Sequence, residues 1–431
     1  MKRHDTPPEV ATVLARHMPR NVTSLLDPSV GSGALVAPFV KRLSRNGRLT
    51  CVDISPAAID EAKKNLGRRV GLGIDCDYVT GDFLKWSTKR LNLLAETFDT
   101  VVLNPPFAGK LNEWCDAPAE ILGFRSRVPL EIAFLFRCIE LTKPGGSVLA
   151  IVPASVICGE QTGWLREHLL TKGAIKFVRE LPLSTFPGVE CRFYLLVFVK
   201  GARSEHSVLC NHDLEGKERM QVSTQLIRNH LRLDFAFYES VRDFEQLRSA
   251  VKGEWSTLAD RCEIIRGRIA SPEGARRGMH TTDYFDGVWY GNERHKSKRT
   301  DDPRFNIMSH DLLMSRVGRR CLLTCGRSRY SRGVPLSDCV ICFRPSKPKD
   351  SIDLLFTIRV LFGSVLYQSQ LVRGSGASFV TMRSLQSAWI PDSLKMLFPR
   401  EFSRFEVAAK KFDVSEMRKI EDSVRRKLSL V

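Results

Sequence analysis

The sequence lacks any long run of apolar residues. The longest apolar stretches, such as residues 193–199 (FYLLVFV), reach about a third of the roughly 20 residues that a membrane-spanning helix requires. The first ten residues, MKRHDTPPEV, also lack the apolar core of a secretory signal peptide. We find no internal repeat and no low-complexity tract. These absences predict a cytoplasmic protein with no membrane-spanning segment.

Acidic residues are scarce relative to basic ones. The chain has 48 Asp and Glu against 66 Lys and Arg, which gives a net charge of +18. Such an excess predicts a polyanionic partner, either nucleic acid or an acidic membrane surface. The first 200 residues carry a net charge of +6, and residues 201–431 carry +12. The basic surface is therefore expected mainly in the second part of the chain.

The remaining composition is that of a globular protein. Apolar residues make up 43% of the 431 residues and charged residues 26%, which excludes full-length disorder, collagen and coiled coil. This length predicts two or three domains. Twelve cysteines are scattered along the chain, a pattern that favours reduced thiols over a disulfide framework.

Residues 1–200 alternate apolar strands with helical patterns. Continuous apolar strands separated by helices predict a parallel sheet that is covered on both faces. Only a loop joins the last two strands, so the last one is expected to run antiparallel to its neighbours. We expect strands at 22–27, 49–54, 77–80, 98–103, 146–152, 174–181 and 192–199, and helices at 33–43, 56–66 and 129–141.

A small and polar run at 200–204 marks the expected domain boundary. We predict one domain over residues 1–200 and a second over residues 201–431. The second part has short apolar runs divided by Gly, Arg and Ser, and a charged helical segment at 400–428. It is interpreted as a mixed α/β domain.

A glycine-rich turn follows the first expected strand and has the sequence DPSVGSG, from Asp27 and Pro28 to Gly31 and Gly33. Glycines let a backbone approach a ligand closely, and a following helix N-terminus favours a negative group. Two glycines alone are often only a turn. The position of this turn between a strand and a helix favours the ligand interpretation.

Two acidic residues stand at the ends of the next strands. Asp53, followed by Ile54, ends the second strand at the spacing from Gly33 where a carboxylate can hold a ribose diol, although it could instead cap the helix that follows. Asp82, in Gly81-Asp82-Phe83, follows the third strand and could accept a hydrogen bond from an adenine amino group, or be a plain turn residue. Together with the glycine turn, they predict an adenosine-containing cofactor.

The fourth strand is followed by Asn104-Pro105-Pro106-Phe107. This sequence suits methylation of a planar conjugated amine, whose lone pair is delocalised into its ring. The Asn104 side-chain oxygen and the Pro105 carbonyl can each accept one N–H, which localises the lone pair for attack on a sulfonium methyl group. The prolines stiffen the loop, and Phe107 offers a face for the target ring. Asn-Pro-Pro is also a good turn sequence.

Residues 1–200 resemble the catalytic domain of the gamma class of DNA amino-methyltransferases. These are mostly N6-adenine enzymes that use S-adenosylmethionine. The resemblance implies a seven-stranded Rossmann-like methyltransferase sheet with a reversed last strand. The matching motifs, in order, are TPPEVA from Thr6, DPSVGSG, VDI at 52–54, GDF at 81–83, NPPF, EIAFL at 131–135, LTKPGG at 141–146, VPAS at 152–155, the segment 181–186 and the strand at 193–199.

The resemblance assigns roles to the matching positions. Asn104 and Pro105 would hold the adenine amine, and Phe107 would stack on the ring in place of the Tyr of many members. Asp53 would bind the ribose hydroxyls and Asp82 the cofactor's adenine. Thr6 and the loop 27–33 would surround the methionine end, and Pro106, Ile54 and Phe83 complete the expected site. No metal ion is expected.

Family members of this chain order carry a C-terminal target-recognition domain. Here residues 311–319 (DLLMSRVGR), 374–376 and 385–391 resemble type I restriction specificity subunits. Basic side chains in expected loops could contact phosphates or guanine edges of double-stranded DNA, although any one of them could be a solvated surface charge. They are Arg266, Arg268, Arg276, Arg277, Lys296, Lys298, Arg299, Arg327, Arg329 and Arg332.

A competing motif lies in the second part. Cys321, Cys325, Cys339 and Cys342 have zinc-ribbon-like spacing. Residues 322–324 and 340–341 instead favour strand interiors, where cysteine is a common small core residue. The core interpretation is the one we adopt.

The resemblance implies site-specific DNA adenine N6-methylation by base flipping, within restriction–modification and with a cognate restriction endonuclease as a candidate partner. Three alternatives stay open. The target could be the N4 amine of cytosine, because that amine meets the same chemistry. It could be an RNA base or a glutamine of a release factor, since NPPF or NPPY loops occur in those enzymes too. The chain could also be a catalytically inert DNA-specificity module.

Overall fold

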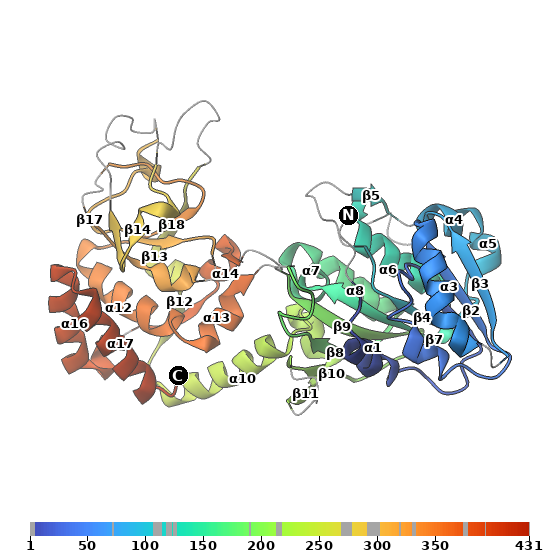
Figure 1. Cartoon of the computed structure of the whole chain (residues 1–431). Coiled ribbons are helices and arrows are strands. Elements are labelled where there is room, and N and C mark those ends of the chain that lie inside the picture. The colour runs from blue at the N-terminus through green and yellow to red at the C-terminus, as the bar shows by residue number, and fades with distance from the viewer. Residues whose placement is uncertain are drawn as a thin grey trace. The chain divides into compact units, whose positions relative to one another are not determined.

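The computed structural model describes residues 5–70, 73–106, 114–117, 123, 127–188, 191–212, 218–268, 278–290, 302–318, 320–329, 333–373, 378–392 and 394–430. The chain forms two compact units, Met1–Phe235 and Ala236–Val431 (Figure 1). Within the described ranges, no helix combines the length and the apolar character needed to cross a membrane.

The first unit is built on one large sheet. Over the described residues it has nine strands in the order β11-β10-β8-β9-β7-β4-β1-β2-β3. The strands are β1 (Ser24–Asp27), β2 (Arg48–Asp53), β3 (Asp75–Thr80), β4 (Phe98–Leu103), β7 (Thr142–Pro153), β8 (Gly173–Glu180), β9 (Phe193–Lys200), β10 (His206–Cys210) and β11 (Arg219–Ser223); β5 (Trp114–Asp116) and β6 (Arg127–Pro129) form a separate hairpin.

Seven of these strands confirm the expected sheet. β3, β2, β1, β4 and β7 pair in parallel, and β9 runs antiparallel to both β7 and β8. The last of the seven strands in the chain is therefore the reversed one. Short, partly polar strands β10 and β11 then extend the sheet at its edge. The expected boundary at residue 200 thus falls between strands of one sheet, and the compact units divide instead after Phe235.

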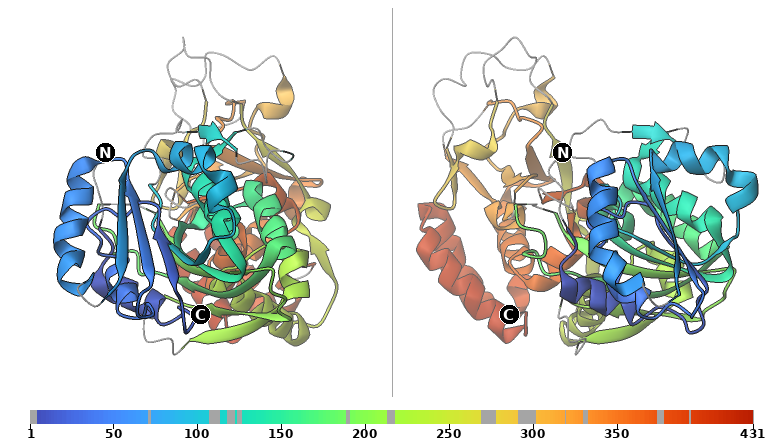
Figure 2. Two further views of the ribbon diagram at one scale, coloured as in Figure 1. Left: turned by 90° about the vertical axis from the view of Figure 1, so that its right-hand side faces the viewer. Right: turned by 45° about the vertical axis from the view of Figure 1, so that its right-hand side comes forward.

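Helices cover both faces of this sheet. Figure 2 shows α3 over one face and α6 and α8 over the other. The apolar side of α1 shares a core with α3 and the strands. The helices of the unit are α1 (Pro8–Ala15), α2 (Ala37–Val40), α3 (Pro56–Val70), α4 (Phe83–Lys89), α5 (Leu91–Leu94), α6 (Leu130–Leu141), α7 (Ala154–Cys158), α8 (Gly163–Lys172) and α9 (Thr224–His230).

The helix expected at 33–43 is wrong in length. Only Ala37–Val40 is helical, and residues 33–36 form turns. Gly33 has a φ of +81°, which is outside the right-handed helical region, and Pro38 has no N–H to donate to a preceding carbonyl. The glycine turn is therefore followed by a short helix rather than a long one.

The second unit has a smaller sheet. Over its described residues this sheet has six strands in the order β13-β18-β16-β17-β15-β14. These are β13 (Cys262–Arg266), β14 (Tyr284–Phe285), β15 (Val288–Tyr290), β16 (Leu312–Ser315), β17 (Gly326–Arg329) and β18 (Val340–Pro345). Two small pairs join β12 (Trp255–Thr257) to β21 (Trp389–Pro391), and β19 (Val372–Arg373) to β20 (Phe379–Val380). The unit is mixed α/β, as expected.

An apolar helix, α12 (Ser351–Phe362), lies at the centre of the second unit. Its side chains share one core with residues of α16 (Pro399–Lys411) and α17 (Val414–Lys427). Arg359 of α12 donates from Nε to Glu421 of α17 at 2.6 Å, and both side chains are about 95% buried. The other helices are α10 (Phe235–Ala250), α11 (Leu258–Arg261), α13 (Val365–Leu371), α14 (Met382–Gln386) and α15 (Leu394–Leu397).

Two expectations for the second unit need correction. The helical segment 400–428 is two helices, broken where Phe412 adopts a φ of +57° and Asp413 caps α17 by accepting from Glu416 N–H at 3.0 Å. Residues 321–324 form a 3₁₀ helix rather than a strand, because Leu323 N–H donates to the Arg320 carbonyl, only three residues before it, at 3.0 Å.

The four cysteines of the zinc-like spacing do not share one environment. Cys321 and Cys325 belong to the core around α12, whereas Cys342 faces a second core across β18. Burial raises the pKa of the Cys325 thiol to about 12, as expected for an apolar core cysteine. The described part of the chain contains no group of three or more His, Cys, Asp or Glu side chains arranged to hold a metal ion.

Candidate active site

The expected site residues meet at one edge of the large sheet. β1 lies between β2 and β4, and all three strands are parallel. Asp27 is the last residue of β1, Asp53 is the last of β2, and Asn104 follows directly after β4. Because the carboxyl ends of parallel strands lie at the same edge, the fold brings together three motifs that are far apart in the sequence.

The glycine loop is bound to the end of β2. Gly31 has a φ of +54° and donates its N–H to Asp53 Oδ2 at 2.9 Å. The Gly33 backbone has a φ of +81°, and a Cβ atom on this residue would lie 3.1 Å from Leu66 Cγ of α3. Gly33 is therefore required for the turn and for close packing on α3, rather than by the approach of a ligand alone.

The Asp53 carboxylate accepts two backbone hydrogen bonds, one with each oxygen. Its Oδ1 accepts from Ser55 N–H at 2.9 Å, just before α3 begins, while Oδ2 accepts from the glycine loop. A carboxylate has about four acceptor positions, so two backbone bonds leave room for ribose hydroxyls. Ile54, the next residue, is 72% exposed, which is unusual for an isoleucine and offers an apolar surface beside that carboxylate.

Asp27 is an acidic residue that is buried in the protein interior. Its side chain is fully buried, and Oδ1 accepts from Ser29 N–H at 3.1 Å. Oδ2 has no hydrogen-bond partner among the residues that the structure describes. Burial raises the pKa of Asp27 to about 7; the Ser29 N–H opposes this rise, and the charge of Asp53 adds to it. A buried carboxylate oxygen without a partner is costly, and a ligand donor or cation would relieve that cost.

Two polar atoms of Asn104 have hydrogen-bond partners among the described residues, and its side-chain oxygen has none. Its Nδ2 donates to Thr6 Oγ1 at 3.1 Å, and its backbone carbonyl accepts from Ser29 Oγ at 3.0 Å. The Oδ1 atom is buried and, within the described ranges, accepts no hydrogen bond. The side chain therefore has a buried acceptor that lacks a donor, and an aromatic amine could supply that donor.

The remaining predicted residues divide into four groups. Pro28 and Pro105 are buried and Pro106 is half-buried beside Asn104. Asp82 caps α4, because its Oδ1 accepts from Lys85 N–H at 3.1 Å. Phe83 is 2% exposed and packs its ring 5.0 Å from that of Phe134, so its side chain belongs to the core. Phe107 lies outside the described residues.

Sequence reasoning missed the polar side chains that join these motifs. Ser29 links the glycine loop to Asn104, as described above. Ser32 donates from Oγ to Asp5 Oδ1 at 2.9 Å, which ties the same loop to the segment before α1. The position of both serines inside DPSVGSG was the available signal, but their partners lie 75 and 27 residues away.

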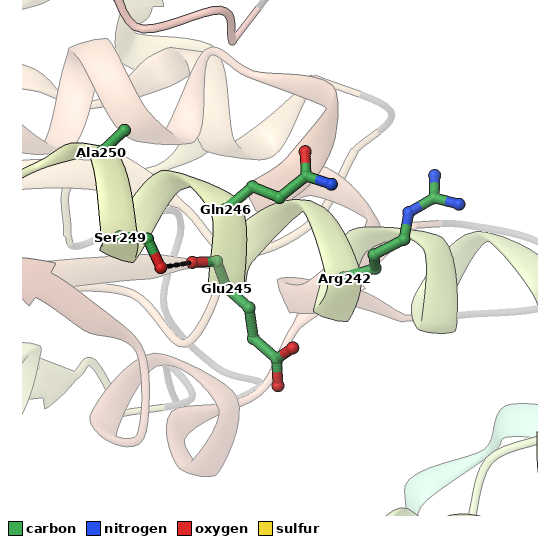
Figure 3. Close-up of a pocket in the computed structure, with 5 residues that line it drawn as sticks. All are labelled: Arg242, Glu245, Gln246, Ser249 and Ala250. Atoms are coloured by element: carbon green, nitrogen blue, oxygen red, sulfur yellow. Dashed lines mark hydrogen bonds between the residues drawn. The ribbon is translucent and has the colours of Figure 1, made fainter.

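Two surface hollows lie away from this site. One, of about 640 Å³, runs along α10 and is lined by Arg242, Glu245, Gln246, Ser249 and Ala250 (Figure 3). The other, of about 550 Å³, lies where β8 begins and β9 ends, at the opposite edge of the sheet from Asn104; its basic lining residues are Lys172, Arg203 and Arg228.

Some of the basic residues expected to contact DNA fall within the described ranges. These are Arg266, Arg268, Arg327 and Arg329. The first two form ion pairs with Asp338 and Asp302, each at 3.6 Å, and the other two lie 5.5 Å from the ring of Phe412. All four therefore have contacts within the protein. The other six lie outside the described residues.

Curated relatives match part of the chain. This chain is 29% identical over 170 residues to the type II methyltransferase M.BsuBI of Bacillus subtilis, and the match covers 36% of this chain and 34% of that protein. It is 24% identical over 193 residues to the type II methyltransferase M.TthHB8I of Thermus thermophilus, covering 42% and 40%. The matched region thus spans between a third and two fifths of the length of these relatives.

Solved structures are also similar. The match to the type IIG restriction endonuclease BpuSI covers 93% of this chain and 61% of the BpuSI chain, at 14% identity and a TM-score of 0.47. The match to the methyltransferase subunit of a type I restriction–modification system from Streptococcus thermophilus covers 57% of this chain and 54% of that subunit, at 19% identity and a TM-score of 0.41.

A family model described as N-6 DNA methylase matches residues 3–268, which is more than half of the chain. The cofactor of such methylases is S-adenosylmethionine, and the residues present fit it: the unpaired Asp27 oxygen offers a partner to a cationic group, and Asp53 and Ile54 offer a carboxylate and an apolar surface to a nucleoside. The large mostly parallel sheet with its reversed strand is that of a class I S-adenosylmethionine-dependent methyltransferase. The chain belongs to the N-6 DNA methylase family.

Proposed function

We propose that this protein methylates the N6 amine of adenine in double-stranded DNA, at a specific site and on a base turned out of the helix. The observation that carries this proposal is the buried, unpaired Oδ1 of Asn104 at the carboxyl end of β4. An oxygen in this state is stable only when a donor completes its hydrogen bonding. An exocyclic N–H of a nucleobase is such a donor.

The chemistry explains why an acceptor is needed rather than a strong base. The lone pair of adenine N6 is delocalised into the ring, so the amine is a poor nucleophile. When Asn104 Oδ1 and the Pro105 carbonyl each accept one N–H, the nitrogen moves towards tetrahedral geometry and its lone pair becomes available. The amine proton can leave after transfer. The two prolines fix the direction of the carbonyl.

The neighbouring residues take complementary roles in this proposal. Bound S-adenosylmethionine supplies a methyl group activated by its sulfonium. Asp53 accepts the ribose hydroxyls, Ile54 covers one side of the nucleoside, and Asp82 receives the adenine amino group with the oxygen that does not cap α4. Asp27 and the loop to Gly33 surround the methionine end. Phe107 stacks on the flipped target ring.

Target recognition is assigned to the second unit. Charge supports this assignment, since Ala236–Val431 carries a net charge of +12 and Met1–Phe235 one of +6. The order of motifs, with the cofactor loop before NPPF and the extra domain last, supports the gamma class. The relatives named as type II methyltransferases and as a type I subunit support a restriction–modification setting, with a cognate endonuclease as a partner.

Long-read sequencing of DNA from cells that express the protein tests the proposal. We expect N6-methyladenine at one short sequence motif, and none in cells that express Asn104→Ala. Cofactor binding by Asn104→Ala, measured by thermal shift with S-adenosylmethionine, should stay close to that of the wild type. This variant therefore separates loss of transfer from loss of the fold.

The alternatives predict different outcomes of the same work. N4-methylcytosine in the sequenced DNA would change the target base but keep the chemistry. Methylated RNA with unmodified DNA would replace the substrate; a relative at 31% identity over 99 residues is a ribosomal RNA large subunit methyltransferase of Vibrio parahaemolyticus, of which the match covers 24%. An inert specificity module would show no thermal shift with the cofactor.

A further inference from the structure

The hydrogen bond between Asn104 and Thr6 has a consequence for the amide itself. An asparagine side chain has a donor end and an acceptor end, and the two exchange places by rotation about χ2. Only one orientation serves the proposed reaction, since the target amine brings N–H groups that Oδ1 can accept and Nδ2 cannot. Some protein group must therefore hold the Nδ2 end.

Thr6 is placed to do this. Its Oγ1 accepts from Asn104 Nδ2 at 3.1 Å, and the residue is 5% exposed, so water competes little for the bond. In the same arrangement Oδ1 is buried and has no acceptor bond within the described ranges. The donor end is satisfied and the acceptor end is left for a substrate.

The position of Thr6 is itself fixed by the cofactor loop. The adjacent Asp5 accepts from Ser32 of the glycine loop at 2.9 Å, and Ser29 of that loop donates to the Asn104 carbonyl at 3.0 Å. Three segments, at residues 5–6, 29–32 and 104, are thus joined in a closed set of hydrogen bonds. Pro7 follows Thr6 directly, which restricts the Thr6 backbone.

We infer that Thr6 is a positioning residue for transfer, which orients the Asn104 amide so that Oδ1 faces the target amine. This rests on the proposed function and differs from the role that the sequence resemblance gives to Thr6, which is contact with the cofactor. The two roles affect different kinetic constants. An orienting residue acts on kcat, and a cofactor ligand acts on the KM for the cofactor.

Three variants of the full chain test the inference. Thr6→Val removes the acceptor with little change in volume, Thr6→Ser keeps it, and Thr6→Ala covers the case in which valine disturbs folding. Thr12→Val is the matched control, because Thr12 lies on the exposed side of α1 and, among the described residues, its hydroxyl donates to the Pro8 carbonyl of the same helix at 2.7 Å. The assay measures transfer of labelled methyl groups to DNA that contains the site found by sequencing.

We expect Thr6→Val and Thr6→Ala to lower kcat about tenfold, with the cofactor KM within about twofold of wild type. Thr6→Ser should recover most of the lost kcat, and Thr12→Val should match wild type. An unchanged kcat in Thr6→Val, or a raised cofactor KM at unchanged kcat, would overturn the positioning role while leaving the proposed function intact. Wild-type protein that transfers no methyl group to DNA would instead overturn the proposed function, and the inference with it.

Discussion

The buried carboxyl of Asp27 gives a prediction that depends on the structure alone. Asp27→Asn keeps the Oδ1 that accepts from Ser29 and removes the ionisable group from the end of β1. In the wild type, burial raises the pKa of this carboxyl from 3.8 to about 7. The folded state therefore binds a proton at pH values where the unfolded chain has already released it.

The sign and size of the effect follow from proton linkage. An acid with a raised pKa in the folded state costs nothing below its unfolded pKa, and lowers stability as the pH rises towards its folded pKa. The difference between 3.8 and about 7 corresponds to a total cost of about 4 kcal/mol, of which more than half arises between pH 5 and pH 8. Asp27→Asn removes this pH-dependent cost, whatever constant penalty its buried NH₂ group brings.

Urea unfolding of both proteins at several pH values between 5 and 8 measures the effect. We expect the unfolding free energy of Asp27→Asn minus that of the wild type to rise by about 2–3 kcal/mol across this range. Asp99→Asn is the control: burial of Asp99 is outweighed by hydrogen bonds from Lys143, Thr23 and Ser24, which hold its pKa well below the usual range. The unfolding free energy of Asp99→Asn minus that of the wild type should therefore stay constant between pH 5 and pH 8. A flat difference for Asp27→Asn would refute the reasoning.

Two further predictions concern the second unit and the target base. Arg359→Met removes the nearest partner of the buried Glu421 and leaves it, among the described residues, only Arg425, whose Nη2 lies 4.0 Å from Glu421 Oε2. The unfolding free energy should fall by about 3–5 kcal/mol, and Arg359→Met combined with Glu421→Met should recover most of the loss in urea unfolding. Equal loss in both variants would contradict the pairing. Phe107→Ala should lower kcat/KM for DNA methylation, and Phe107→Tyr should retain most of it, since only the aromatic face is needed; equal loss in both variants would argue against stacking.

The sequence predicted the part of the fold that buries continuous apolar strands. Residues 98–103 are expected to form a strand and do so, because their apolar run can be satisfied only inside a sheet. β10 and β11 were not expected, since strands at a sheet edge mix polar and apolar residues and pair through their backbones. The predicted boundary at residue 200 lies just before these two strands, whereas the compact units divide after Phe235.

The site was predictable as a set of motifs but not as a network. Asp27, Asp53 and Asn104 were each singled out by their place at the end of a strand or directly after it, and the parallel order of those strands brings them to one edge. The bond between Asn104 and Thr6 joins residues 98 positions apart, which no local pattern indicates. The ring of Phe83 faces the core because it begins α4 beside Phe134, a contact that depends on helix packing.

A crystal structure of the protein with the non-reactive cofactor analogue sinefungin tests the central claim most directly. The account predicts that the analogue binds against the glycine loop and Asp53, and that Asn104 Oδ1 faces the analogue's amine with Nδ2 still bonded to Thr6. A structure in which Oδ1 turns away from the analogue, or in which a protein donor occupies it, would contradict the account.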